Sequence, residues 1–207
     1  MTGIRVLIIE DEPLIAKNIG MYLNNHDYEV AAFAYDVEEA MYQLKRQPPD
    51  FAIIDINLEC DKDGIDIATY INQHNFIPFI FLTSYSDKDT LDRAKKTNPS
   101  GFIVKPFNEK TLYATIEIAL SNHATQANKH VPALSLDKLN RCLLAPFTER
   151  EFEVIKKIYE GKTNQQMTDE LCIAMNTLKK HINNAYFKLE VTSRTTAIAK
   201  LREYMLK

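Results

Sequence analysis

The sequence contains no apolar run that approaches the ~20 residues needed to span a bilayer. Residues 1–9 also lack the charged start and the small-residue cleavage site of a signal peptide. We therefore expect a cytoplasmic protein that has no membrane partner. No internal repeat and no low-complexity segment is present.

Cysteine is scarce in this chain. Cys60, Cys142 and Cys172 are the only three, and they lie far apart without metal-ligand spacing. Neither a disulfide framework nor a zinc site is therefore indicated, and we expect three reduced thiols.

The net charge of −3 conceals an uneven distribution along the 207 residues. Residues 1–122 carry 11 basic and 19 acidic side chains, a net charge of −8, whereas residues 123–207 carry 14 and 9, a net charge of +5. An acidic domain followed by a basic one indicates different partners, although +5 is modest for a nucleic-acid-binding domain. The chain length also suits two small domains with separate cores.

The first ~120 residues alternate short apolar runs with amphipathic stretches, which is the pattern of βα units in a parallel sheet. The central runs are continuously apolar, as strands covered on both faces require. The pattern predicts strands at 4–9, 28–33, 51–54, 78–82 and 101–104, and helices at 13–25, 36–46, 64–73, 87–95 and 108–121.

The pattern changes after residue 122. Residues 123–146 have no sustained period and are expected to be a linker between a first domain at 1–122 and a second at 147–207. The second domain has only helical patterns, and two capping boxes, Thr148-x-x-Glu151 and Thr163-x-x-Gln166, open its first two helices. Gly161 is expected to end the first helix, and further helices are expected at 175–189 and 194–205.

Polar side chains follow four of the predicted strands in the first domain. Because the carboxyl ends of parallel strands meet at one edge of a sheet, these side chains should lie close together. Converging carboxylates repel one another unless a cation such as Mg²⁺ is bound, and a lysine and a hydroxyl beside them supply donors for a phosphoryl group. The residues are Glu10-Asp11-Glu12, Asp55, Thr83-Ser84 and Lys105-Pro106.

These positions resemble the receiver domains of two-component response regulators over residues 4–120. The matching segments are Ile-Ile-Glu-Asp-Glu-Pro at 8–13, Ile-Ile-Asp-Ile-Asn-Leu at 53–58, Phe-Leu-Thr-Ser at 81–84 and Gly-Phe-Ile-Val-Lys-Pro-Phe at 101–107. Each segment alone is weak evidence for a receiver domain, but four matching segments in this order and spacing are specific for one. The resemblance implies an α/β fold with a flavodoxin-like, doubly wound parallel five-stranded sheet.

The resemblance also implies a role for each polar residue at this edge. Asp55 is the nucleophile that accepts a phosphoryl group from a sensor histidine kinase, and such a weak carboxylate nucleophile depends on a metal and on positioning. The Mg²⁺ ligands are Glu10, Asp11, Asp55 and the backbone carbonyl of Asn57. Lys105 pairs with the phosphoryl oxygens, Thr83 is the switch hydroxyl, and Phe102 is the switch aromatic.

Each of these residues has an ordinary structural interpretation as well. A lone aspartate after a strand is usually a turn or cap residue, and Phe102 alone would more often be a core residue. Lys105 alone would be a solvated surface lysine, while the proline after it suggests a cis peptide bond. Residues 58–64 depart from the common receiver pattern, which affects the loop that meets the kinase or phosphatase.

Residues 147–207 resemble the four-helix, helix-turn-helix DNA-binding domain of the LuxR/NarL class. The matches are Phe-Thr-Glu-Arg-Glu-x-Glu-Val-Ile at 147–155, Gly-Lys-Thr-Asn-Gln-Gln-Met at 161–167, Thr-Leu-Lys-Lys-His-Ile at 177–182 and Lys-Leu-Glu-Val-x-Ser-Arg at 188–194. The helix from residue 175 is then the recognition helix that enters the major groove. Its candidate DNA-contacting residues are Thr177, Lys179, Lys180 and Asn183.

Other features of this domain are more structural. Lys162, Lys188 and Arg194 are expected to contact backbone phosphate. Ala174 stands where a capping serine or threonine is usual, which should weaken the start of the recognition helix by ~1 kcal/mol. The last helix could be core or a dimer seam. Leu178, Ile182, Ala185 and Leu189 should form the buried stripe of the recognition helix.

The sequence therefore predicts a response regulator in which phosphorylation controls DNA binding. Its partners would be a sensor histidine kinase, double-stranded promoter DNA and, on activation, a second copy of the chain. It would not be an enzyme beyond Mg²⁺-dependent self-phosphorylation and autodephosphorylation. One alternative is an adaptor whose helical domain binds protein, and another is a stand-alone Mg²⁺-dependent phosphatase or hydrolase.

Overall fold

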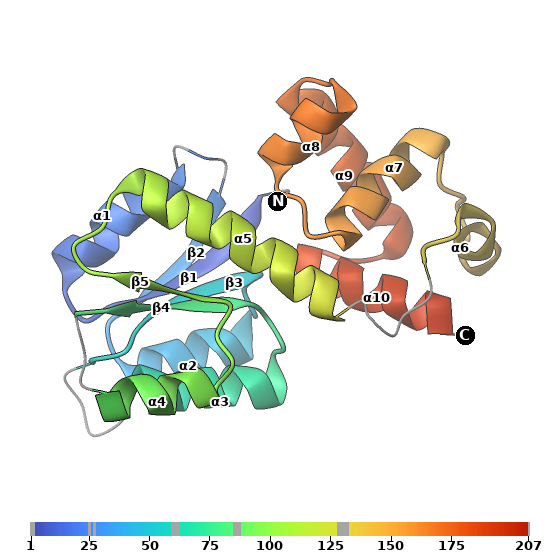
Figure 1. The fold of residues 1–207 in the computed structure, drawn as a ribbon. Helices are drawn as coiled ribbons and strands as arrows, with labels where there is room; N and C mark the ends of the chain where they lie inside the picture. Colours follow the sequence, from blue (N-terminus) through green and yellow to red (C-terminus); the bar gives the residue numbers. More distant parts are fainter. Residues whose placement is uncertain are drawn as a thin grey trace. The chain divides into compact units, whose positions relative to one another are not determined.

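The computed structural model describes residues 3–24, 26, 28–58, 63–84, 88–127 and 133–206. The contacts divide the chain into two compact units, one of which is Ile4–Ala119, while the other comprises Leu120–Lys207 together with Met1–Gly3. The first unit is an α/β structure and the second contains only helices (Figure 1). Among the residues so described, no helix is both long and apolar enough to cross a membrane.

The first unit is built on a five-stranded parallel sheet in the order β2-β1-β3-β4-β5. This order is that of flavodoxin-like doubly wound folds, and it confirms the predicted fold class. Every residue of β1, β3 and β4 is buried, because helices cover both faces of the sheet. The strands are β1 (Ile4–Ile9), β2 (Tyr28–Ala34), β3 (Phe51–Asp55), β4 (Phe79–Thr83) and β5 (Gly101–Val104).

Two layers of helices cover the sheet. On one face lie α1 (Pro13–Asn24) and α5 (Glu109–Ala127), and on the other lie α2 (Val37–Arg46), α3 (Gly64–His74) and α4 (Lys88–Lys96) (Figure 1). Predicted and observed boundaries agree to within about two residues, apart from the end of α5, which runs past residue 121. Residue 87, the predicted first residue of α4, lies outside the described residues.

The second unit contains α6 (Leu136–Cys142), α7 (Glu149–Tyr159), α8 (Asn164–Leu171), α9 (Met175–Leu189) and α10 (Arg194–Leu206). Both predicted capping boxes are present, at the start of α7 and of α8. Gly161 follows α7 with a φ of 81°, a conformation that favours glycine. α9 has the predicted bounds, and its N-cap residue, Ala174, makes no side-chain capping bond, as expected.

Helix α6 lies within the stretch 123–146 that we expected to be a linker. Its Leu139 is completely buried in the core of the helical unit, and Asn140 donates to the backbone carbonyl of Phe147 and accepts from its N–H, at 3.3 and 2.7 Å. Much of this stretch is therefore part of the helical unit. The sequence did not indicate it, because a seven-residue helix with one fully buried side chain shows no amphipathic period.

From its sequence, the last helix could be core or a dimer seam. Ala197, Leu201 and Met205 are buried among α7 and α9 residues, so this stripe of α10 is core. Cys142 and Cys172 are exposed free thiols, as expected, whereas Cys60 lies outside the described residues.

Candidate functional site

The sheet register brings the predicted acidic residues to one edge. Ile9, the last residue of β1, pairs with Ile54, and Asp55 on β3 pairs with Leu82 on β4. Backbone pairing continues past the strand ends, where Lys105 N donates to Thr83 O at 2.8 Å. Residues far apart in sequence therefore meet because the strands are parallel and end at the same edge.

A buried ion triad lies at this edge. Lys105 Nζ donates to Asp55 Oδ2 at 2.7 Å, and it lies 2.8 Å from Glu10 Oε1 and 2.7 Å from Glu10 Oε2. Both carboxyl groups are buried, so the lysine compensates charges that water cannot reach. The peptide bond after Lys105 is cis, as its proline suggested.

Burial and the neighbouring charges shift two pKa values in this triad. Burial raises the pKa of Glu10 to about 7, with a further contribution from Asp55, although the hydrogen bond from Lys105 opposes the shift. Burial alone would lower the pKa of Lys105, but its hydrogen bonds to Asp55 and Glu10 outweigh burial and raise it. Lys105 therefore stays charged at neutral pH, and Glu10 gains and loses its proton near pH 7.

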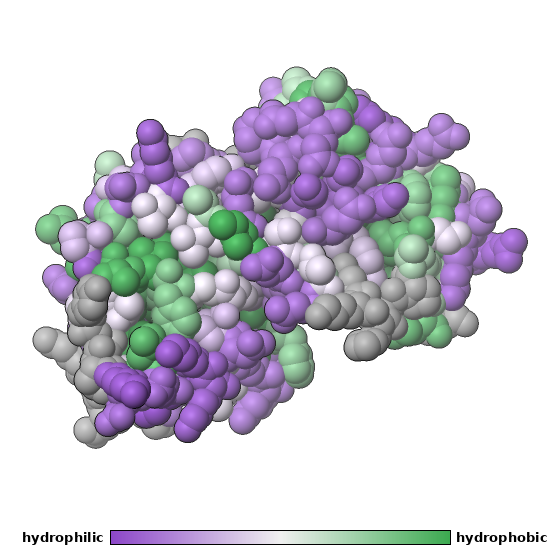
Figure 2. Space-filling view, viewed as in Figure 1, coloured by the Kyte–Doolittle hydropathy of each residue, from purple (hydrophilic) through white to green (hydrophobic). Residues whose placement is uncertain are grey.

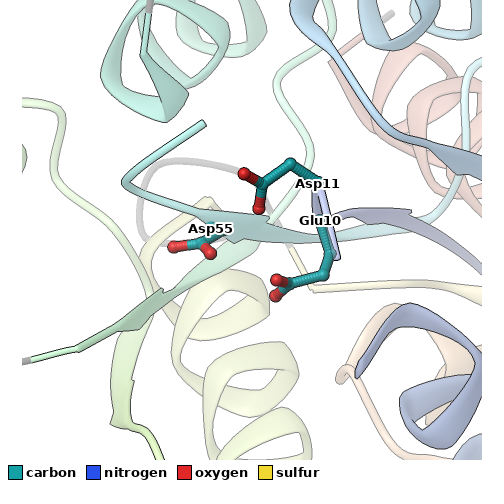
Figure 3. A group of neighbouring side chains, drawn as sticks. All are labelled: Glu10, Asp11 and Asp55. Atoms are coloured by element: carbon teal, nitrogen blue, oxygen red, sulfur yellow. The ribbon is translucent and has the colours of Figure 1, made fainter. Parts of the chain in front are cut away.

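Asp11 completes the acidic cluster. Figure 3 shows Glu10 and Asp11, from the end of β1, with their carboxylates directed towards Asp55 on β3. Ligand oxygens of the three residues all lie within 4.8 Å of one another, a grouping that could hold a metal ion. Asp11 is the most accessible of the three, so the cluster is open on its side.

The remaining predicted residues lie around the cluster. Asn57 donates its backbone N–H to Asp55 Oδ1 at 3.1 Å, which directs the second carboxylate oxygen towards Lys105. Thr83 is buried at the end of β4, one residue after Leu82, which pairs with Asp55. Phe102 is partly buried against the core, with its ring centroid 5.7 Å from that of Phe81. Its switch role stays a prediction.

Gly64, at the start of α3, is a site residue that our sequence reasoning missed. Its backbone N–H donates to Ile56 O at 3.0 Å, and a Cβ at this position would lie 2.0 Å from the carbonyl oxygen of Asp55. Only glycine allows α3 to begin this close to the strand that carries Asp55. The middle of the loop before it, residues 59–62, lies outside the described residues.

In the helical unit, α9 has a buried and an exposed face. Leu178, Ile182, Ala185 and Leu189 are completely buried, which confirms the predicted stripe. Thr177, Lys180 and Asn183 are exposed, and Lys179 is partly exposed. Four candidate DNA-contacting residues are thus accessible on one helix, whereas three basic residues predicted to contact phosphate have partners within the protein.

Lys188 and Arg194 are bound internally. Lys188 Nζ donates to Glu151 Oε2 at 2.6 Å and to Pro146 O at 2.7 Å, which ties α9 to the start of α7. Arg194 is 5% exposed and donates to the carbonyls of Ile158 and Lys162. The structure thus gives both residues a role in positioning helices, because each has a buried residue, Glu151 or Ile158, among its partners.

Lys162 also has a partner, but an accessible one. Its Nζ lies 2.7 Å from Glu170 Oε1, while Lys157 Nζ lies 2.5 Å from Glu170 Oε2. The hydrogen bonds from Lys157 and then Lys162 lower the pKa of Glu170. Glu170 is therefore ionised at neutral pH and shared between two lysines.

The sheet order, the two helical layers and the acidic edge define a receiver-type α/β domain. The family model described as response regulator receiver domain matches residues 6–117, and the one described as bacterial regulatory proteins, luxR family, matches residues 145–201. The chain therefore belongs to the response regulator receiver family, and it joins this domain to a luxR-type regulatory domain.

Known relatives agree with this assignment. Response regulator protein VraR of Staphylococcus aureus is 29% identical over 204 residues, which cover 94% of each chain. Transcriptional regulatory protein PdtaR of Mycobacterium tuberculosis is 36% identical over 117 residues, and the match spans only 57% of its length. The solved signal receiver domain of a modulated diguanylate cyclase from Desulfovibrio desulfuricans G20 matches with a TM-score of 0.56 and 34% identity, over 59% of this chain and 97% of that one.

Proposed function

We propose that this protein is a phosphorylation-controlled transcription regulator in which Asp55 accepts a phosphoryl group from a sensor histidine kinase. The observation that carries the proposal is the triad of Glu10, Asp55 and Lys105 at the edge of the parallel sheet. In the transfer, an oxygen of the Asp55 carboxylate forms a bond to phosphorus as the phosphorus–nitrogen bond of a phosphohistidine breaks, and the imidazole leaves. Lys105 and Thr83 then supply donors to the phosphoryl oxygens.

We infer that the metal of this site is Mg²⁺, held by Glu10, Asp11, Asp55 and the Asn57 carbonyl. The donor set supports this choice, because all of its members offer oxygen atoms, which are the ligands that a hard cation such as Mg²⁺ prefers. When bound, Mg²⁺ would neutralise charge that develops on the transferring group.

Magnesium binding is expected to strengthen as the pH rises from 6 to 8. Because the pKa of Glu10 is raised to about 7, the metal must displace a proton below that pH but not above it. Calorimetric titration in two buffers of different ionisation enthalpy would count the released protons. Glu10→Gln is the control and should bind Mg²⁺ more weakly without this pH dependence. Equal pH dependence in that variant would assign the proton to another group.

The helical unit would bind promoter DNA through α9. Accessible Thr177, Lys179, Lys180 and Asn183 support this role, because Lys can bond to guanine and Asn to adenine in the major groove. Activation would favour a homodimer on two half-sites about one helical turn apart. The domain boundaries expected from the sequence, a receiver at 1–122 and a DNA-binding domain at 147–207, remain part of the proposal, with α6 packed onto the second domain.

A second candidate is an adaptor whose helical unit binds protein. The observation that favours it is that Lys188, Arg194 and Lys162, three of the expected phosphate contacts, are bound within the protein. Fewer basic side chains then remain to neutralise phosphates. DNA binding that weakens steeply with salt would decide for the first candidate, since protein contacts release few counterions.

Beryllofluoride, a mimic of the phosphoryl group, is expected to tighten DNA binding by the full chain and to favour the dimer. Light scattering and DNA titrations at two salt concentrations measure both effects. Thr83→Ala is the matched variant. It should still be phosphorylated on Asp55 but lose the coupling, because the hydroxyl that responds to the phosphoryl group is gone. Equal affinity with and without beryllofluoride would show that the receiver does not control DNA binding.

A further inference from the structure

Lys162, which lies near the DNA-binding helices, has a partly exposed acidic partner, Glu170. Lys162 precedes Thr163, the N-cap residue of α8, which is the helix before the recognition helix. In helix-turn-helix proteins that helix crosses the DNA backbone. The Lys162 and Glu170 side chains are both 34% exposed. In contrast, Lys188 and its partner Glu151 are 19% and 5% exposed. The Lys162–Glu170 pair can therefore be broken at small cost, whereas breaking the Lys188 pair would leave a buried charge.

The backbone around Lys162 is fixed, which leaves its side chain as the part that can move. Lys162 N donates to Lys157 O at 3.1 Å, and Lys162 O accepts from the Arg194 guanidinium. Glu170 lies near the end of α8, where Arg150 holds the carbonyl of the next residue, Leu171, at 2.7 Å. The backbones of Lys162 and Glu170 are thus held at a fixed separation. Only the ion pair between their side chains keeps Lys162 Nζ beside the Glu170 carboxylate.

From this geometry we propose that Glu170 is an intramolecular competitor for DNA phosphate, holding Lys162 away from the DNA backbone until a phosphate replaces the carboxylate. The proposal rests on the proposed DNA-binding function. Lys162 is the competing lysine because Lys157 has a second partner, Glu160, at 3.5 Å. A contact of this kind lowers affinity for DNA of any sequence, since phosphate contacts do not read bases. Figure 2 shows a largely hydrophilic surface over α8, as a phosphate-facing surface requires.

The test is a DNA titration of the full chain with a duplex of mixed sequence at several salt concentrations. Glu170→Gln keeps the shape of the side chain but releases Lys162. We expect binding up to about fivefold tighter at low salt, which is the worth of one exposed ion pair. We also expect the salt dependence to steepen by about 0.9 in the logarithmic slope, because one more phosphate is neutralised.

Two further variants separate this effect from a general change in charge. Glu153→Gln removes an equal charge from a pair with Arg150 on α7, and Arg150 keeps its bond to Leu171 O. It should change affinity much less than Glu170→Gln. In a chain that also carries Lys162→Met, Glu170→Gln should give no gain in affinity for the duplex. Thermal unfolding of each variant would check that the fold is retained.

The possible outcomes are distinguishable. If the wild-type chain binds the duplex but Glu170→Gln does not tighten binding, the competitor role is wrong and the DNA-binding function stands. If Glu153→Gln tightens binding equally, or the gain persists without Lys162, the effect is one of net charge and the proposal also fails. If no variant binds DNA in a salt-dependent manner, both the inference and the DNA-binding function are overturned.

Discussion

Asp55→Asn is expected to abolish the formation of acyl phosphate from a small phosphodonor in the presence of Mg²⁺. The amide has no nucleophilic carboxylate oxygen, and no other carboxylate of the cluster can substitute for it. Among the three acidic residues, Asp55 accepts a hydrogen bond on each carboxylate oxygen. Lys105 Nζ donates to Oδ2, and the backbone N–H of Asn57 donates to Oδ1, so the carboxylate is held in one orientation. Intact-mass measurement, or separation of phosphorylated from unphosphorylated chain, would record the loss.

The control for this variant is Asp36→Asn. Asp36 follows β2 at the same edge of the sheet and caps α2 through a bond from Glu39 N at 2.8 Å. Asparagine caps helices as well as aspartate does, so the variant should fold and be phosphorylated normally. A normal yield of phosphorylated chain from Asp55→Asn would overturn the assignment of the acceptor. Loss of phosphorylation in both variants would point instead to a general requirement for acidic charge at this edge.

Gly64→Ala is expected to destabilise the receiver domain by about 3 kcal/mol, the upper end of the usual cost of overpacking. The added Cβ would lie 2.0 Å from Asp55 O and 2.8 Å from Ile54 Cγ2, and a backbone carbonyl in a central strand cannot move aside easily. Urea unfolding measures the loss. Because the strain is applied to Asp55 itself, the fraction that remains folded should also be phosphorylated more slowly than wild type.

Gly20→Ala provides the comparison. A Cβ at Gly20, on α1, would meet the end of the Phe33 ring at 3.0 Å, and a side chain can shift more readily than a strand. Alanine also favours the helix by roughly 1 kcal/mol, so the stability should stay within about 1 kcal/mol of wild type. An unchanged unfolding midpoint for Gly64→Ala would mean that α3 can move away from β3, and that the glycine is not what fixes this contact.

The ion pairs of the helical unit bear on how its net charge is interpreted. A net charge of +5 over residues 123–207 was a modest signal for DNA binding. The structure weakens this signal further, because two of the basic side chains, Lys188 and Arg194, bond to other parts of the helical unit. They join α7, α9 and the turn before α8. The accessible polar face of α9, rather than the overall charge, is therefore the stronger support for DNA binding.

The sequence by itself determined the features that depend on short separations along the chain. The two capping boxes join residues three apart, and the buried stripe of α9 follows the helical period, so both are visible in one dimension. The acidic edge was also predictable, although its residues are far apart in sequence. The carboxyl ends of parallel strands meet at a common edge of the sheet. This rule, applied to the sequence alone, places Glu10, Asp55 and Lys105 together.

Only the tertiary structure decided which basic residues are accessible and where glycine is required. Lys162, Lys188 and Arg194 look alike in sequence, but their partners are Glu170, Glu151 and two backbone carbonyls. The partners of Lys188 and Arg194 lie more than 30 positions away, and their identity depends on how α7, α9 and α10 pack. Gly64 is required for a similar reason, because the atom it must avoid belongs to another element. A periodic pattern indicates which face of a helix is buried, but it does not indicate which atoms meet that face.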